Sequence, residues 1–500
     1  MTLLIKNVQI LGGKQKFSDK SDVFISNGKI IAIGKFPEKK ADEVVDGRGN
    51  YLCPGFIDVN TDSDHYLSIF TNPSQADFLK QGITTIVGGL CGASLAPLLY
   101  GSLKSIESWA DTQQANVNWH STAEFLKTLS QKKLGVNFVT LTGHSTIREA
   151  IIGEPSRSLT KNELVVFGET LKRSLREGSF GLSSGLSYAE GRDTPYQELK
   201  FLVSIVEKFN GVYATHLRNT ELKLIESIDE TIKISEETGA KTLISHFLPI
   251  REGGGKYEKA IIRINDLPKS SDFNFDIYPF DEKVLALYTF LPTWAQRDNI
   301  RVMAMALKDE WLKPKIIADL PSLDSKNLII ARAVKNNSIV GYSLKDFRDL
   351  YSIKNNREAL YKLMETTGLQ ATVFYKNIDL NLVREAIKSP RSFIATNAAS
   401  FEENSSEKIL KPKRATSTFT EFLRLVQEDK IMSLDDAISK ITEQPAQKFD
   451  LQNRGRVAEG FFADLVCFRS NEIKFVIVNG ILAVHDGKLK NTSAGRVFKH

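Results

Sequence analysis

The chain has 500 residues, 42% of them hydrophobic and 25% charged, which is the balance of an ordinary soluble globular protein. Its net charge of +6, from 66 basic and 60 acidic residues, is small and forms no basic tail, which argues against nucleic acid as the main partner. No apolar run approaches the roughly 18 residues of a membrane-spanning helix, and the start lacks the layout of a signal peptide, so we expect no membrane contact.

Short strands and turns are predicted at both ends of the chain. Residues 4–10 form one predicted strand, and residues 22–34 form a hairpin around Asn27-Gly28, a dipeptide that supplies positive φ angles. The last fifty residues repeat this style, with a second hairpin at Asn479-Gly480. Two hairpin-rich ends around a different middle predict one small β domain, made of residues 1–54 plus 447–500. The alternative is two unrelated edge hairpins.

Between the two ends, over residues 55–446, short apolar strands alternate with helical patterns. One example is the strand at residues 211–215, followed by a helix over residues 221–238 that stops at Gly239. Repeated strand-then-helix units indicate a parallel sheet, either open or closed into a barrel. Residues 283–345 break this rhythm with two helical runs, and we predict an insertion there that could cover the site as a lid.

Functional side chains in such folds cluster where strands end and loops begin. Two of the seven histidines, His216 and His246, end β-like runs about thirty residues apart, the length of one strand–helix–strand unit. Cys91 holds a similar place after another predicted strand. One thiolate and two imidazoles are a reasonable ligand set for Zn²⁺ that leaves a position open for water. On spacing alone, the alternative is that the histidines are satisfied polar residues and Cys91 is part of the core.

The three cysteines are too few and too scattered for a disulfide framework, which favours a reducing, cytoplasmic location. Nothing in the sequence indicates the oligomeric state. The cysteines are Cys53, Cys91 and Cys467.

Several further stretches occur in an order typical of one protein family. They are residues 54–58, 81–85, 91–97, 143–148, 178–188, 213–218, 244–246, 276–280, 454–456 and 463–466. Together they resemble the N-acyl-D-amino-acid deacylase (D-aminoacylase) branch of the amidohydrolase superfamily over nearly the whole chain. The resemblance implies a (β/α)8 TIM-type barrel with a small β-sandwich domain. It also implies a metal-dependent hydrolase of non-peptide carbon–nitrogen (amide) bonds that deacylates an N-acyl amino acid of the D series.

The resemblance assigns roles to individual residues. In that family a cysteine and two histidines hold a tightly bound zinc, and these positions fall on Cys91, His216 and His246. An arginine that binds the substrate carboxylate matches Arg414. We therefore expect a small-molecule substrate that carries an amide and a carboxylate. Tyr278 and Tyr188 are candidate hydrogen-bond donors to that substrate, with a purely structural role as the alternative.

The chain departs from the family pattern at two places. Where the family has His-x-His for a weaker second metal, this chain has Asn60-Thr61-Asp62. Where the family has Ser-Asp-Gly, whose aspartate activates the attacking water, this chain has Thr396-Asn397-Ala398. Asn397 cannot accept a proton from water, although such general base catalysis is typically worth about 10²–10⁴-fold in rate.

Asp62 is the candidate to replace the general base that is missing at Asn397. If Asn60, Asp62 and Asp64 share one strand face, Asp62 could act as the base. It could also ligate a second, harder cation such as Mn²⁺ or Mg²⁺. His65 would lie on the opposite face and become a ligand only if the strand ends early. His144 is expected to support the barrel or a loop.

Two other functions are compatible with these departures. A decayed site with a merely solvated Asp62 would leave a catalytically silent barrel that binds a small acylated ligand or a partner protein. A third hypothesis is altered chemistry on the same scaffold, such as hydrolysis of a cyclic amide or a lyase reaction. The metal content of the purified protein would separate these enzymes from an empty barrel.

Overall fold

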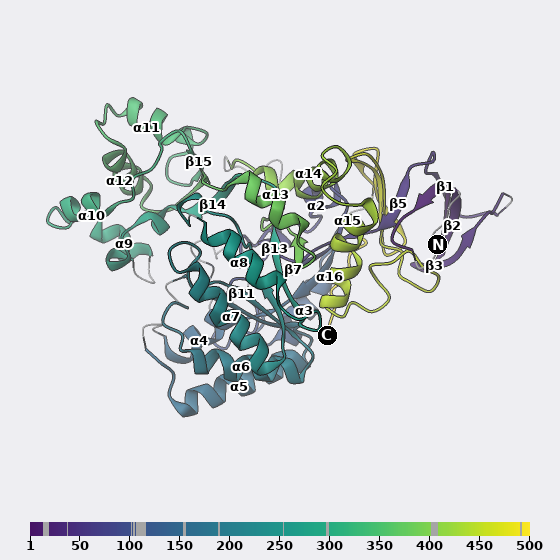
Figure 1. Ribbon diagram of the computed structural model, residues 1–500, viewed down its shortest axis with the longest axis horizontal. Coiled ribbons are helices and arrows are strands. Elements are labelled where there is room, and N and C mark those ends of the chain that lie inside the picture. The colour runs from purple at the N-terminus through teal and green to yellow at the C-terminus, as the bar shows by residue number, and fades with distance from the viewer. Residues whose placement is uncertain are drawn as a thin grey trace.

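The computed structural model describes residues 1–13, 20–37, 39–101, 103, 106, 117–153, 157–188, 191–253, 255–296, 300–401, 409–490 and 493–500. Three parts follow one another along the long axis of the molecule (Figure 1). A helical insertion lies at one end, a strand-and-helix barrel occupies the middle, and a β-rich part built from the chain termini lies at the other end.

Parallel strands in the middle of the chain form a closed barrel. They pair in the orders β6-β7-β8 and β9-β10-β11-β12-β13-β17, and a single residue, Leu141, separates β8 from β9. The barrel closes where the Asn397 amide donates to the Asn60 carbonyl at 2.8 Å and the Asp62 amide donates to the Ala398 carbonyl at 2.9 Å. The predicted (β/α)8 barrel is therefore confirmed. Its strands are β6 (Phe56–Asp58), β7 (Ile83–Gly88), β8 (Asn137–Thr140), β9 (Thr142–Gly143), β10 (Gly181–Gly185), β11 (Val212–His216), β12 (Lys241–Ile244), β13 (Phe273–Ile277) and β17 (Ser392–Ile394).

Capping residues fix the start of one helix between these strands and the end of another. A capping box of Thr160 and Glu163 starts α5, and Gly239, with a φ of 75°, ends α7 as predicted. None of the helices in the described part of the chain combines the length and apolarity needed to cross a lipid bilayer. The helices of the barrel region are α1 (Ser68–Thr71), α2 (Ala76–Leu79), α3 (Thr122–Ser130), α4 (His144–Ile152), α5 (Lys161–Arg176), α6 (Tyr196–Lys208), α7 (Leu224–Thr238), α8 (Lys256–Asn265), α13 (Leu380–Lys388), α14 (Lys413–Gln427), α15 (Leu434–Ile441) and α16 (Glu443–Lys448).

Strands from both ends of the chain share one sheet with the order β21-β20-β19-β18-β5-β1-β2-β3, and β4 pairs with β1. The two ends meet where β5 pairs antiparallel with β18. Asn-Gly turns with positive φ angles join β2 to β3 and β19 to β20. The exact boundaries of the β domain stay a prediction. The strands are β1 (Thr2–Ile10), β2 (Ser21–Ser26), β3 (Lys29–Gly34), β4 (Glu43–Asp46), β5 (Tyr51–Pro54), β18 (Leu465–Arg469), β19 (Glu472–Val478), β20 (Ile481–His485) and β21 (Lys488–Leu489).

The insertion between β13 and α13 has an antiparallel sheet and a hydrophobic core of its own. The sheet has the order β14-β16-β15, so its central strand is the last of the three in sequence. The insertion was expected to cover residues 283–345. That range ends inside α11, before the central strand β16. The elements are β14 (Glu282–Ala286), η4 (Leu287–Phe290), η5 (Thr293–Ala295), α9 (Ile300–Ala306), α10 (Lys313–Asp319), β15 (Leu328–Ala333), η6 (Asn337–Ile339), α11 (Leu344–Leu350), α12 (Asn356–Thr367) and β16 (Ala371–Lys376).

A buried lysine of α15 ties this helix to the start of the last barrel strand. The ammonium of Lys440 donates to the carbonyls of Ser389 and Ser392, at 2.6 and 2.9 Å, and to the Ser392 hydroxyl at 2.9 Å. Replacing Lys440 with Met leaves two buried carbonyls without this donor. We expect the free energy of unfolding to fall by about 2–3 kcal/mol, measured by urea denaturation.

The same variant has a defined pH dependence. Burial lowers the pKa of Lys440 from 10.5 to about 7. Above about pH 7 the unfolded chain therefore keeps a proton that the folded state has lost, so this residue makes the free energy of unfolding rise with pH. The stability difference between wild type and Lys440→Met should widen from about pH 7 to about pH 9. A difference that stays constant over this range would contradict the pKa direction.

Candidate metal centre

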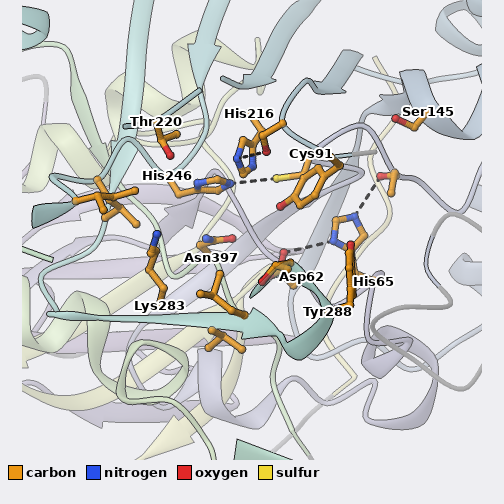
Figure 2. Close-up of a pocket in the computed structure, with 18 of the residues that line it drawn as sticks. Asp62, His65, Cys91, Ser145, His216, Thr220, His246, Lys283, Tyr288 and Asn397 are labelled. Atoms are coloured by element: carbon orange, nitrogen blue, oxygen red, sulfur yellow. Dashed lines mark hydrogen bonds and ion pairs between the residues drawn. The ribbon is translucent and has the colours of Figure 1, made fainter. Parts of the chain in front are cut away.

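The three predicted metal ligands converge at one end of the barrel (Figure 2). His216 is the last residue of β11, His246 follows β12, and Cys91 follows β7, so parallel strand ends bring them to the same rim. Cys91 Sγ lies 3.3 Å from His246 Nε2, and one ligand atom from each residue lies within 4.8 Å of the others. A single metal ion could therefore contact all three side chains.

The backbone at two of these ligands adopts an uncommon conformation. Cys91 and His246 have φ angles of 52° and 36°, a region that residues with a Cβ atom rarely occupy. At His246 the amide donates to Asp276 Oδ1 at 2.8 Å, which holds the residue in place. Such conformations persist where the surrounding structure fixes them, and they cluster at functional sites.

The protonation states of the histidines suit a metal site. Burial lowers the pKa of His246 to about 4 and that of His216 well below its usual range, so both rings are neutral and can offer a lone pair. His216 Nε2 lies 2.9 Å from the Ser187 hydroxyl, whereas Nδ1 is buried and has no hydrogen-bond partner among the described residues. An unsatisfied imidazole nitrogen beside a thiol fits a thiophilic cation. Burial, and after it the nearby carboxylates, raise the pKa of the Cys91 thiol, and a coordinating cation would favour its thiolate.

A cavity of about 320 Å³ opens in front of these ligands. Besides the three ligands, Tyr188, Tyr278, Asn397 and Arg414 line it, so the predicted substrate-binding residues share this space. The insertion, which the sequence suggested could cover the site as a lid, forms one wall of the cavity, although none of its residues had been named as a site residue. The lining residues from β14 to η5 and the segment that follows are Lys283, Val284, Leu285, Tyr288, Thr289 and Gln296.

Arg414 is a buried cation at this cavity. It lies in the first turn of α14, and its guanidinium carbon is 5.0 Å from the centre of the Tyr278 ring. Its Nε has no hydrogen-bond partner among the described residues, so this donor is available for an oxygen of a ligand. Burial raises the pKa of Tyr278 to about 12, so its hydroxyl keeps its proton and can donate as well.

Comparison with known proteins gives relatives over the full chain, although no family model matches it. The chain is 26% identical over 478 residues to the N-acyl-D-aspartate deacylase of Alcaligenes xylosoxydans xylosoxydans, covering 93% of this chain and 85% of that protein. It is 24% identical over 514 residues to the D-aminoacylase of the same organism, covering 99% and 97%. A crystal structure of N-acyl-D-glutamate deacylase from Bordetella bronchiseptica, complexed with zinc and a phosphonate inhibitor, has the same fold. It aligns with a TM-score of 0.81 and 22% identity over 100% of this chain and 99% of that chain.

The resemblance to the D-aminoacylase branch of the amidohydrolase superfamily that the sequence predicted is confirmed by these full-length similarities. The departures of this chain from the pattern of that branch lie at the edge of the cavity. Strand β6 ends at Asp58, so the expectation that Asn60, Asp62 and Asp64 share a strand face is wrong. Alternation holds only within a strand, and the backbone turns after Asp58. The Asn60 side chain donates to Asp276 Oδ2 at 3.0 Å, and Asp64 accepts from the Gly89 amide at 2.5 Å.

Asp62 alone of these three side chains lines the cavity, where it faces His65. His65 Nδ1 lies 3.4 Å from Asp62 Oδ1, and His65 Nε2 lies 3.2 Å from the Ala93 carbonyl. Both neighbours are acceptors, so the ring donates twice and is an imidazolium. Burial opposes this charge, but Asp64 and Asp62 outweigh it and raise the pKa of His65 to about 9. His65 is therefore an ion-pair partner and stands outside the ligand cluster.

The other sequence departure, Asn397, also faces the cavity. It follows β17 with a φ of 44°, a left-handed conformation that asparagine tolerates better than most residues. Its amide nitrogen makes the barrel-closing bond to Asn60. By contrast, His144 lies away from the cavity and hydrogen-bonds Glu198 at 2.8 Å, in line with the expected supporting role.

Proposed function

We propose that this chain is a metal-dependent amidohydrolase that removes the acyl group from an N-acyl amino acid, of the D series as in its named relatives. The observation that carries the proposal is the convergence of Cys91, His216 and His246 on one cavity that also holds Arg414. A cation site and a buried guanidinium in the same space suit a substrate with a polarisable carbonyl and a carboxylate.

The chain's own residues bind and orient this substrate. The Arg414 guanidinium holds the carboxylate through its planar donors, and the Tyr278 hydroxyl donates to the same end of the substrate. A single Zn²⁺ held by Cys91, His216 and His246 would polarise the acyl carbonyl and make water a better nucleophile. Tyr188, whose hydroxyl hydrogen-bonds the Cys91 thiol, keeps that ligand in position.

Asp62 is the base in this proposal. It is the one carboxylate among the described residues that line the cavity. Burial raises its pKa, but the hydrogen bond and the charge of His65 outweigh this effect and lower it, so Asp62 is ionised. The buried neighbour Asp276 is occupied, since its oxygens accept from Asn60 and from the His246 amide. Asp62 takes the proton of the attacking water, and the departing amine receives that proton when the carbon–nitrogen bond breaks.

Several wider properties belong to the same proposal. The three cysteines are free thiols, which supports a reducing, cytoplasmic location. In the alternative to its role as the base, Asp62 would supply an oxygen ligand for a weaker second divalent cation. The chain divides into a β domain of residues 1–54 plus 447–500 and a hydrolase barrel of residues 55–446. The substrate is a small molecule rather than a nucleic acid or a membrane.

A substrate screen tests the proposed function. Purified protein with added Zn²⁺ or Mn²⁺ is assayed for release of free amino acid from N-acetyl-D- and N-acetyl-L-amino acids. Hydrolysis in the D series supports the proposal. Hydrolysis of cyclic amides alone would replace it with the third hypothesis, and absence of any metal or turnover would leave a silent binding protein.

Replacing Arg414 with Lys tests how the carboxylate is held. Lysine keeps the charge but loses the planar fork that pairs with two oxygens. We expect KM for N-acyl amino acids to rise about 10- to 100-fold, the equivalent of one or two charge-assisted hydrogen bonds. The matched control is an N-acyl amine without a carboxylate. An equal loss on both substrates would show that Arg414 supports the fold instead.

A further inference from the structure

Strand β14 passes the cavity as the edge strand of the insertion sheet. In the order β14-β16-β15 it pairs with β16 on one side and with none of the described strands on the other. Three consecutive residues, Lys283, Val284 and Leu285, line the cavity, where the strand crosses below Asn397 in the view of Figure 2. Successive side chains of a strand point to opposite faces, so neither face alone could bring all three to the cavity. The cavity therefore lies along the free edge of β14.

The hydrogen bonds of the sheet show which backbone groups point to this free edge. In β16 the Lys376 amide donates toward the β15 side, to the Asn327 carbonyl at 2.9 Å. Backbone groups alternate along a strand, so Phe374, two residues earlier, also points to β15. Val284 stands opposite Phe374 in the antiparallel register of β14 and β16. Opposite residues in such a pair either exchange both bonds or point apart, so the N–H and C=O of Val284 point to the free edge.

A second contact of the sheet supports the same direction. Ile330 of β15 donates its amide to the Tyr342 carbonyl at 2.9 Å, so its backbone points away from β16. Val373, which stands opposite Ile330, therefore turns to β14 and bonds with Leu285. The neighbouring Val284 must then point away from β16. Neither of its backbone groups has a hydrogen-bond partner among the residues that the structure describes.

A free strand edge beside a binding cavity suits a ligand that carries an amide group of its own. A peptide unit offers one N–H and one C=O, the two groups that pair with an edge residue such as Val284. A simple acyl chain offers neither. Arg414 and the three metal ligands line the same cavity, so the molecule that reaches this edge is the substrate itself.

We propose that the Val284 edge is a subsite for a second amide group, carried by the acyl part of the substrate. The favoured substrates are then N-acylaminoacyl amino acids, that is, short peptides from which the C-terminal residue is released. This inference rests on the proposed deacylase function and deepens it. The hydrolysis consumes one water, whose oxygen joins the acyl carbon. The released residue leaves with a free amine, and the remaining peptide ends in a new carboxylate.

Three N-acyl-D-leucines with acyl chains of equal length test the subsite. The acetylglycyl group carries the additional N–H and C=O, the 4-oxopentanoyl group replaces this N–H with CH2, and the pentanoyl group has neither. We expect kcat/KM of wild type to fall in this order, by about 2- to 10-fold at each step, the usual worth of one neutral hydrogen bond. Equal values for the three substrates would overturn the inference, while their hydrolysis would uphold the deacylase function.

Val284→Pro tests the position of the subsite on the chain. Proline removes only an N–H that lies on the free side of an edge strand, where this residue is tolerated. We expect the advantage of 4-oxopentanoyl over pentanoyl to disappear, because it depends on this N–H. The advantage of acetylglycyl over 4-oxopentanoyl should remain, because it depends on the Val284 carbonyl.

Val284→Ala is the matched control, since it shortens the side chain and keeps both backbone groups. It should keep the wild-type ratios between the three substrates. Wild-type ratios in Val284→Pro would overturn the assignment of the subsite to this edge. If proline unfolds the protein, the substrate series on wild type decides alone.

A binding measurement separates failure of the inference from failure of the proposed function. If wild type hydrolyses no N-acyl amino acid, the proposed function fails. The inference is then decided by the shift in Tm of the zinc-loaded protein with N-acetylglycine, 4-oxopentanoate or pentanoate at equal concentration. A larger shift with N-acetylglycine than with pentanoate upholds the subsite, and equal shifts overturn it.

Discussion

Cys91→Ala is expected to lose the bound metal and with it nearly all hydrolytic activity. The thiolate is one of three ligand groups, and the two imidazoles of His216 and His246 alone would hold zinc weakly. Loss of a Lewis acid that contributes several kcal/mol to transition-state stabilisation corresponds to at least about 10³-fold in kcat. Elemental analysis of purified protein should show one zinc per chain in wild type and close to none in the variant.

The matched control is Cys467→Ala. Cys467 is also a free cysteine, but it is fully buried on β18, in the core of the β-rich part. We expect this variant to keep its metal and its kcat, with a loss of stability of about 1–2 kcal/mol from the cavity created. Equal zinc content in wild type and Cys91→Ala would remove Cys91 from the ligand set and withdraw the main support for the proposed hydrolase.

The clustering of the three candidate metal ligands could be predicted from the sequence because their position depends on a local rule. Cys91, His216 and His246 each stand at or just after an apolar strand, and parallel strands bring such positions to one rim. The turns at Asn27-Gly28 and the end of α7 at Gly239 depend on equally local chemistry, namely the positive φ angles that these residues allow.

Other features depend on contacts between distant parts of the chain. The sequence does not show that β6 ends at Asp58, and this single boundary decides that Asp62 faces the cavity while Asn60 turns to Asp276. Lys283 enters the site because β14 pairs with β16, which lies beyond four helices in the sequence. Closure of the barrel likewise rests on hydrogen bonds between residues near 60 and near 397.

Asp62→Asn is expected to lower kcat by about 10²–10⁴-fold, the usual contribution of a general base. Asparagine has the same shape as aspartate but cannot take a proton from water. Because Asn397 has the same defect, the variant would have no carboxylate among the described residues that line the cavity. Metal content should stay at the wild-type level, which distinguishes loss of the base from loss of the cation.

A second substitution in the same cavity gives this prediction its control. Asn397→Asp restores a carboxylate where the family pattern places one, and asparagine and aspartate both tolerate the left-handed backbone found there. In the Asp62→Asn background it should recover at least about 10-fold in kcat, because water again has a proton acceptor. Turnover that is unchanged in Asp62→Asn would show that Asp62 serves only to pair with His65. Recovery by Asn397→Asp, in contrast, would show that either of two positions around this cavity can hold the base.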